Sequence, residues 1–151
     1  MDSALTYQAY YTRSNPILNY MTGMLQFKPH DCILEPCGGD GVFVDKILES
    51  ASDVQINVFE LNPSAVAGLK SKYSQKSCIS IKETDTLLDE TIIECSQKYD
   101  KIIGNPPYGA RNDEHKKELL NKLYSALYTK ESYTLFLYAC TRCLKESGEL
   151  C

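Results

Sequence analysis

The sequence predicts an α/β protein in which helices cover both faces of a parallel sheet. Short apolar runs with the length of buried strands alternate with segments whose apolar residues repeat at helical spacing. This alternation is typical of parallel strands joined by crossover helices. The 151 residues contain no internal repeat, linker or low-complexity segment, so a single domain is expected.

The elements are expected in the following order. Strands are predicted at residues 32–34, 54–59, 79–81 and 101–103, and helices at 42–48, 63–72 and 87–96. Two more helices are expected after the fourth strand. The apolar positions of the first are Leu119, Leu120, Leu123, Tyr124 and Leu127. Those of the second are Tyr133, Phe136, Leu137, Cys140 and Leu144. Gly148 is expected to end this last helix.

The turn after the first strand has the composition of a site for a nucleotide-like cofactor. It reads Glu35-Pro36-Cys37-Gly38-Gly39-Asp40-Gly41-Val42-Phe43. Glycines allow a tight turn and a close approach of ligand to backbone, and the following helix offers unpaired N–H donors. The spacing is not G-x-G-x-x-G, and a carboxylate at Glu35 would repel a pyrophosphate and attract a cationic amino group. We therefore expect a cofactor that carries positive charge.

Acidic residues at the ends of the second and third strands extend this site. An acid about 20 residues beyond the glycine turn, such as Glu60, is placed to accept hydrogen bonds from both ribose hydroxyls of an adenosine. Asn62 and Pro63 are expected to begin the next helix and so fix the direction of Glu60. Asp85, after the third strand, suits the exocyclic amine of an adenine. A solvated turn explains Asp85 equally well.

The strongest chemical signal is the tetrapeptide Asn105-Pro106-Pro107-Tyr108, which follows the fourth strand. Its two prolines lack N–H groups and disfavour both helix and sheet, so nearby carbonyls are left without backbone partners. An amide side chain, a carbonyl and a flat ring are thus grouped at a strand end. This grouping suits a planar ring held by its amino group. On the tetrapeptide alone, a rigid turn closed by a packed Tyr is the alternative.

Together these motifs resemble those of the class I S-adenosylmethionine-dependent methyltransferases, and specifically the adenine-specific (N6) DNA methyltransferases of restriction-modification systems. The segment 33–43 is similar to their cofactor motif, and 99–108 is similar to their catalytic motif. The segment Tyr10-Tyr11-Thr12-Arg13 resembles the one that covers the methionine part of the cofactor, together with the apolar positions Ile17, Leu18, Met21 and Leu25. The motif order matches the gamma arrangement of that family.

The resemblance implies a Rossmann-like three-layer sandwich with strand order 3-2-1-4 and a helical N-terminal segment. Residues 1–30 would cover the cofactor, 31–100 would form the cofactor-binding half, and 101–151 would hold the catalytic motif and following helices. The family continues with further strands and a target-recognition domain. We therefore expect an N-terminal fragment, truncated after the fourth strand, with that strand as an open edge. A missing C-terminal part or a partner chain would supply target recognition.

The resemblance also assigns roles. S-adenosylmethionine is the expected cofactor, S-adenosylhomocysteine the product, and no metal is expected. The expected cofactor-binding residues are Tyr11, Thr12, Glu35, Pro36, Cys37, Gly39, Gly41, Phe43, Glu60, Leu61, Asp85, Thr86 and Asn105. The expected catalytic residues are Asn105, Pro106, Pro107 and Tyr108. Tyr108 would stack on an adenine flipped out of DNA, while the Asn105 side-chain oxygen and the Pro106 carbonyl accept hydrogen bonds from its amino group.

Two alternatives use the same residues. Similar tetrapeptides occur in methyltransferases that act on a protein glutamine amide or on a ribosomal RNA base, because any planar amino group fits the same geometry. A cofactor-binding remnant without catalysis is the non-enzymatic alternative, motivated by the expected truncation.

Composition and charge narrow the class of protein. The chain is 43% hydrophobic and 24% charged, as in ordinary globular proteins. Its net charge of −4 does not predict a surface that binds nucleic-acid phosphates, because such surfaces are usually basic. No apolar run approaches the ~20 residues of a membrane span, and the N-terminus lacks signal-peptide features. We therefore expect a cytoplasmic protein without a membrane partner. The scattered cysteines indicate reduced thiols, and the lone C-x-x-C of Cys140 and Cys143 does not predict zinc.

Overall fold

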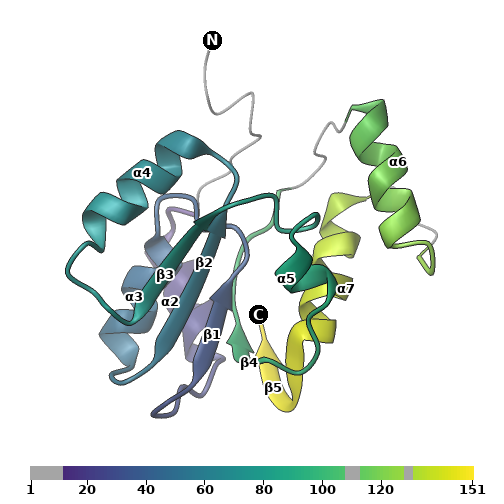
Figure 1. Ribbon diagram of the computed structural model, residues 1–151. Coiled ribbons are helices and arrows are strands. Elements are labelled where there is room, and N and C mark those ends of the chain that lie inside the picture. Colours follow the sequence, from purple (N-terminus) through teal and green to yellow (C-terminus); the bar gives the residue numbers. More distant parts are fainter. Residues whose placement is uncertain (1–11, 108–112, 128–130) are drawn as a thin grey trace.

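A computed structural model describes residues 12–107, 113–127 and 131–151 of the chain (Figure 1). In this part of the chain, five parallel strands form one sheet with the order β3-β2-β1-β4-β5. The strands are β1 (Cys32–Glu35), β2 (Gln55–Glu60), β3 (Ile79–Glu83), β4 (Tyr99–Ile102) and β5 (Leu144–Leu150). The predicted α/β class and the order of the first four strands are confirmed.

Helices cover both faces of the sheet, which gives three layers. On one face lie α2 (Asn15–Gly23), α3 (Val42–Ser50) and α4 (Pro63–Lys72). On the other face lie α5 (Glu90–Ile93) and α7 (Ser132–Cys143), with α6 (Glu114–Leu123) beside α7 (Figure 1). The expected three-layer sandwich and its helical N-terminal segment are therefore confirmed. None of the described helices is long and apolar enough to cross a membrane.

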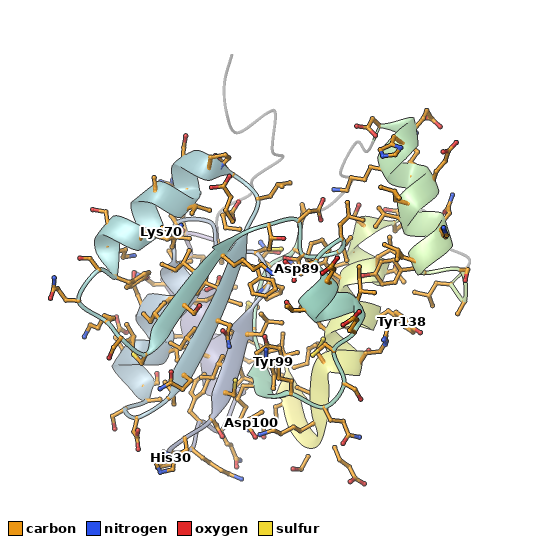
Figure 2. All side chains as sticks on the ribbon, in the orientation of Figure 1. His30, Lys70, Asp89, Tyr99, Asp100 and Tyr138 are labelled. Atoms are coloured by element: carbon orange, nitrogen blue, oxygen red, sulfur yellow. The ribbon has the colours of Figure 1, made fainter. Side chains whose placement is uncertain are left out.

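Alternate residues of each inner strand bury their side chains in two separate apolar cores. Ile33 packs with the layer of α2, α3 and α4, whereas its neighbour Leu34 packs with the layer of α5 and α7. Tyr99, only 1% exposed, fills the second core between the sheet and its helices (Figure 2). The carboxyl ends of all five strands meet at one edge, where a site is expected in such sheets.

The fifth strand corrects the prediction that the sheet stops after the fourth. The apolar pattern predicted that the last helix continues through Leu144 to Gly148, but α7 ends at Cys143 and β5 begins at the next residue. β5 pairs with β4 in parallel, so β4 is an inner strand and not an open edge. Leu144 lies four residues after Cys140 and so continues the helical apolar pattern, although it is the first residue of β5. Periodicity alone therefore placed the end of the helix wrongly.

Tertiary contacts explain why a polar segment forms β5. The residues 145–149 have little intrinsic strand preference. Within them, Glu149 accepts a hydrogen bond at 2.8 Å from the ammonium of Lys101, a β4 side chain that is 3% exposed. The same carboxylate oxygen accepts the backbone N–H of Gln26, also at 2.8 Å. One carboxylate therefore joins β5, β4 and the segment after α2.

The third predicted crossover helix is much shorter than the expected span 87–96. α5 covers only Glu90–Ile93, because Asp89 caps its first turn by accepting the Thr91 N–H at 3.0 Å. Leu87 precedes the cap and lies in a turn in which its N–H donates to Asp85 at 3.2 Å. Capping and local side-chain bonds thus hold the segment after β3 in a loop.

Candidate active site

The loop that follows β4 is held between two neighbouring strands. The N–H of Ile103 donates to the carbonyl of Leu34 at 3.1 Å, and the N–H of Gly104 donates to the carbonyl of Cys151 at 3.2 Å. β1 and the end of β5 therefore fix the start of this loop from either side. Asn105 follows directly at the carboxyl edge of the sheet.

The predicted cofactor turn and the predicted catalytic loop touch each other. A Cβ at Gly104 would lie 3.1 Å from Cδ of Pro36, so glycine permits close packing of the two turns. The hydroxyl of Thr86, which is 4% exposed, donates to the Pro36 carbonyl at 2.5 Å. Pro36 is thus the point where segments after β1, β3 and β4 meet, and Thr86 holds it in place.

Glu60 closes the glycine turn. One of its carboxylate oxygens accepts the N–H of Gly39 at 2.8 Å, and the other accepts the N–H of Asn62 at 2.7 Å. Gly39 has a φ of 53°, a left-handed conformation that favours glycine. Each carboxylate oxygen can accept more than one hydrogen bond, so Glu60 can hold this turn and still accept ribose hydroxyls. Leu61, 44% exposed, lies next to it.

Two predicted cofactor residues, Gly41 and Phe43, lie behind the turn. Gly41 has a φ of 80°, and a Cβ there would lie 2.6 Å from the hydroxyl oxygen of Tyr73 on the segment that ends α4. That hydroxyl donates to the Gly41 carbonyl at 2.8 Å. Phe43 is 3% exposed and belongs to the core under α3. These contacts require glycine at position 41 and bury the aromatic ring at position 43 in the core.

Glu35 is a buried carboxyl at the end of β1. It is 1% exposed, and its Oε2 has no hydrogen-bond partner among the residues that the structure describes. Burial raises its pKa well above the usual value, and the negative charges of Glu60, Asp40 and Asp45 raise it further. An orphaned buried carboxyl among acids is the arrangement that a cationic ligand nearby would stabilise. Burial and the charge of Glu60 likewise raise the pKa of the Cys37 thiol.

A pocket of about 600 Å³ opens at the carboxyl edge beside β4 and β5. Four of the predicted site residues line it together, namely Thr12, Pro36, Asn105 and Pro106. Pro107 is half-buried next to it. The predicted residues Tyr11 and Tyr108 lie outside the described residues. The pocket therefore joins the N-terminal segment to both predicted motifs.

The rest of the pocket wall comes from α2, α7, the end of β5 and the segments around them, through Arg13, Ser14, Ile17, Met21, Ile102, Gly104, Tyr133, Phe136, Leu137, Cys140, Leu150 and Cys151. The sequence predicted a cofactor-covering role for the segment before and within α2 and a catalytic role for the segment around Gly104, but no site role for the residues of α7 and β5. Tyr133 and Leu137 are 42% and 40% exposed, although they occupy apolar positions of α7. The apolar pattern of α7 is wider than covering the sheet requires, and this excess of apolar residues could have predicted that the helix also lines a pocket.

Asn105 makes a long-range contact within this pocket. Its side-chain Nδ2 donates to the hydroxyl oxygen of Thr12 at 3.1 Å. Leu18 and Leu25, in and just after α2, are 3% and 6% exposed and anchor the N-terminal segment in the core. The expected cover segment and the expected catalytic amide are therefore in direct contact.

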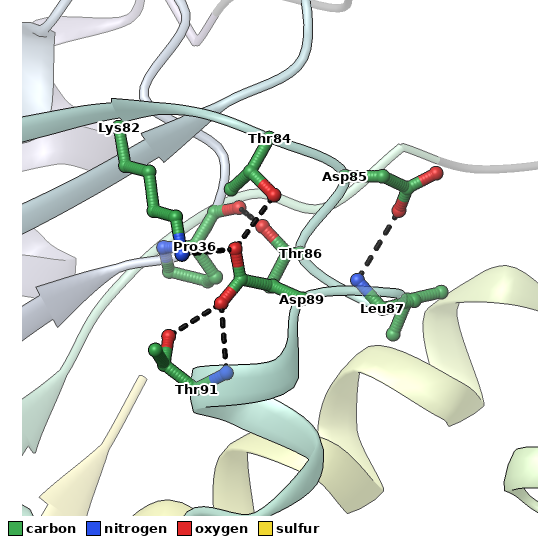
Figure 3. A network of polar contacts seen from close by, with 8 residues as sticks. All are labelled: Pro36, Lys82, Thr84, Asp85, Thr86, Leu87, Asp89 and Thr91. Carbon is green, nitrogen blue, oxygen red and sulfur yellow. Dashed lines mark hydrogen bonds and ion pairs between the residues drawn. The ribbon is translucent and has the colours of Figure 1, made fainter.

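Asp85 lies in the loop between β3 and α5 (Figure 3). One of its oxygens accepts the N–H of Leu87, and the other lies 2.5 Å from the ammonium of Lys116 on α6. Thr86 follows it and points its hydroxyl to Pro36. These contacts fix the loop at the edge where the adenine of a cofactor was predicted.

The fold and the site define a Rossmann-like α/β protein with a glycine turn, an acid after β2 and a polar loop after β4. Residues 43–151 match the Eco57I restriction-modification methylase family, and the chain belongs to this family. The resemblance to restriction-modification methyltransferases is confirmed at this level.

The relatives include a type II methyltransferase, a modification methylase and a ribosomal RNA methyltransferase. The chain is 30% identical over 121 residues to type II methyltransferase M.AccI of Acinetobacter calcoaceticus, covering 77% of this chain and 22% of the relative. It is 30% identical over 130 residues to modification methylase CviBIII of Paramecium bursaria Chlorella virus NC1A, covering 85% and 32%. It is 28% identical over 99 residues to ribosomal RNA small subunit methyltransferase A of Prochlorococcus marinus (strain NATL2A), covering 66% and 34%. The chain thus spans between 22% and 34% of the length of these relatives.

Solved structures share the fold at low identity. An O-methyltransferase from Thermotoga maritima, described as SAM-dependent, superposes with a TM-score of 0.63 at 14% identity and covers 99% of this chain and 47% of its own. A precorrin-6y C5,15-methyltransferase from Geobacter metallireducens GS-15 also gives 0.63, at 11% identity, with 92% and 63% covered. These similarities confirm the Rossmann-like methyltransferase fold.

Proposed function

We propose that this chain carries the methyl-transfer site of an enzyme that methylates the exocyclic amino group of an adenine in DNA, with S-adenosylmethionine as cofactor, as part of restriction-modification. One observation carries the proposal. Thr12, Pro36, Asn105 and Pro106 line a single pocket of about 600 Å³ at the carboxyl edge of the sheet. Membership of the Eco57I restriction-modification methylase family supports methyl transfer and DNA as substrate.

The residues around the glycine turn fit this cofactor. Glu60 and Leu61 after β2, and Asp85 after β3, are assigned to its adenosine part. The turn with Cys37, Gly39 and Gly41 is assigned to its amino-acid part. The orphaned carboxyl of Glu35 stands behind this turn, and an overall positive ligand would offset the charge of the acids there. When bound, this cofactor supplies an electrophilic methyl group on a positively charged sulfur and leaves as S-adenosylhomocysteine.

The pocket residues orient the amino group that accepts the methyl. The side-chain oxygen of Asn105 and the carbonyl of Pro106 accept hydrogen bonds from its two N–H groups. Pro107 disfavours a helical conformation at Pro106, so this carbonyl does not enter a helical hydrogen bond. These bonds draw the nitrogen lone pair out of conjugation with the ring, which makes it nucleophilic. Extruding the base from a duplex costs a few kcal/mol. Stacking on Tyr108 and burial against the apolar wall offset that cost. No role is assigned to a metal.

The division of the chain follows from this assignment. Residues 1–30 cover the cofactor, 31–100 hold it, and 101–151 present the catalytic loop. The chain carries a net charge of −4, so most of the grip on DNA phosphates is assigned to other segments of the enzyme or to a partner chain. We place the reaction in the cytoplasm.

Methylation with labelled S-adenosylmethionine tests the proposal. The substrates are a duplex with many adenines, a duplex of equal length without adenine, and an adenine-containing ribosomal RNA fragment. Nucleoside analysis identifies the labelled base. We expect N6-methyladenine from the first duplex only, and loss of label in Asn105→Ala without weaker binding of S-adenosylhomocysteine in calorimetry.

Other outcomes would replace the proposal. Label in the RNA and not in DNA would assign the site to an RNA base. Label on a protein glutamine offered in the same assay would assign it to protein methylation. Cofactor binding without label in any substrate would favour the non-catalytic alternative.

A further inference from the structure

Thr12, which was expected to contact the cofactor, also contacts the predicted catalytic amide of Asn105. Its hydroxyl oxygen lies 3.1 Å from Nδ2 of Asn105 and accepts a hydrogen bond from it. The two residues are 93 positions apart, and both line the same pocket. Thr12 immediately precedes the segment that leads into α2, whose residues Leu18 and Thr22 are buried. The hydroxyl is therefore held against the catalytic loop by a packed helix.

The orientation of the Asn105 amide decides whether it can serve the proposed reaction. A carboxamide is planar, and its oxygen and its NH₂ group point to different sides of the side chain. When the NH₂ group faces Thr12, the oxygen faces away from Thr12 and can accept a hydrogen bond from an amine. In the flipped orientation the NH₂ group would meet the amino group of the target, and two donors would oppose each other. In the structure the Thr12 hydroxyl oxygen accepts from the NH₂ group, so this contact goes with the useful orientation of the amide.

We propose that Thr12 is a positioning residue that holds the Asn105 amide with its oxygen toward the amino group to be methylated. This inference rests on the proposed function of Asn105 and gives Thr12 a role beyond cofactor contact. A positioning role predicts that the hydroxyl affects turnover at saturating cofactor. A cofactor contact predicts that the hydroxyl affects cofactor affinity and that saturating cofactor restores turnover.

Two substitutions separate these roles. Thr12→Val keeps the shape of the side chain and removes the hydroxyl, whereas Thr12→Ser keeps the hydroxyl. Thr141→Val is the matched control, because Thr141 is exposed on α7 and its hydroxyl donates to the carbonyl of Tyr138 on the same helix at 2.8 Å. We expect Thr12→Val to lower kcat at least tenfold with an unchanged dissociation constant for S-adenosylhomocysteine. We expect Thr12→Ser to restore most of the activity and Thr141→Val to match the wild type.

A second measurement does not depend on activity. In ¹⁵N-labelled protein, the side-chain NH₂ signals of Asn105 are assigned by their loss in Asn105→Ala. We expect one of these protons to exchange slowly with water in the wild type and in Thr12→Ser, and rapidly in Thr12→Val. Unchanged exchange in Thr12→Val would overturn the inference whether or not the protein methylates DNA. Unchanged kcat in Thr12→Val, with an active wild type, would also overturn it and leave the proposed function standing.

Discussion

Asp89 fixes the loop that carries Asp85 and Thr86, and its replacement by Asn is expected to lower stability in a pH-dependent manner (Figure 3). The carboxylate is almost fully buried, yet it lies 2.7 Å from the ammonium of Lys82 and accepts the hydroxyl of Thr84 at 2.6 Å. Burial alone would raise its pKa. The bonds from Lys82, Thr84 and Thr91 outweigh that effect and lower the pKa from 3.8 to about 2.

The size of the effect follows from this shift. Because the folded-state pKa lies below the unfolded one, the ionised carboxylate stabilises the fold above about pH 4, and this contribution is lost as the pH falls toward 2. A shift from 3.8 to about 2 corresponds to about 2 kcal/mol at neutral pH. Asp89→Asn keeps an oxygen that can cap α5 but loses the charge that holds Lys82. For a chain of this size we expect the melting temperature to fall by about 6 °C.

Urea unfolding of wild type and Asp89→Asn between pH 7 and pH 3 measures this contribution. The difference in unfolding free energy should be constant down to about pH 4 and then shrink. Glu118→Gln serves as the control, because Glu118 is an exposed carboxylate on α6. A difference that does not change with pH, or an Asp89→Asn protein as stable as the wild type at pH 7, would refute the reasoning.

Two further predictions concern the cofactor turn. Glu35→Gln should stabilise the cofactor-free chain at pH 7. Because the folded-state pKa of Glu35 is raised, the stability of the wild type falls as the pH rises above about 4.5, whereas the Gln variant has no such loss. Thermal melts in which the variant gains no stability, or gains the same amount at every pH, would contradict this. Gly38→Ala should destabilise by about 1–3 kcal/mol, because its Cβ would lie 2.4 Å from Cγ1 of Val58. The control is Gly68→Ala, whose Cβ would meet no atom within 4 Å and which should stabilise α4 by up to about 1 kcal/mol. Urea unfolding measures both variants. Equal effects of the two alanines would show that the turn tolerates a side chain at position 38.

Elements that depend on neighbouring residues were predicted correctly, whereas an element that depends on residues far apart in the chain was not. The strands around Ile33 and Ile56 follow from local apolar patterns, and Asn62 accepts the N–H of Ser64 at 3.0 Å as the predicted helix cap. The boundary at Leu144 was wrong, because β5 depends on a carboxylate of Glu149 that meets Lys101 on another strand. A pattern within one segment carries no information about such a partner.

The sequence by itself determined the local chemistry of the two turns. Glycine at positions 39 and 41 permits the positive φ angles found there, and the missing N–H groups of Pro106 and Pro107 belong to proline itself. Tertiary structure decided what surrounds these turns, because the pocket wall and the bond between Thr12 and Asn105 join segments far apart in the chain. Packing of α2 and α7 at the edge of the sheet brings those segments together, and no local pattern specifies that distance.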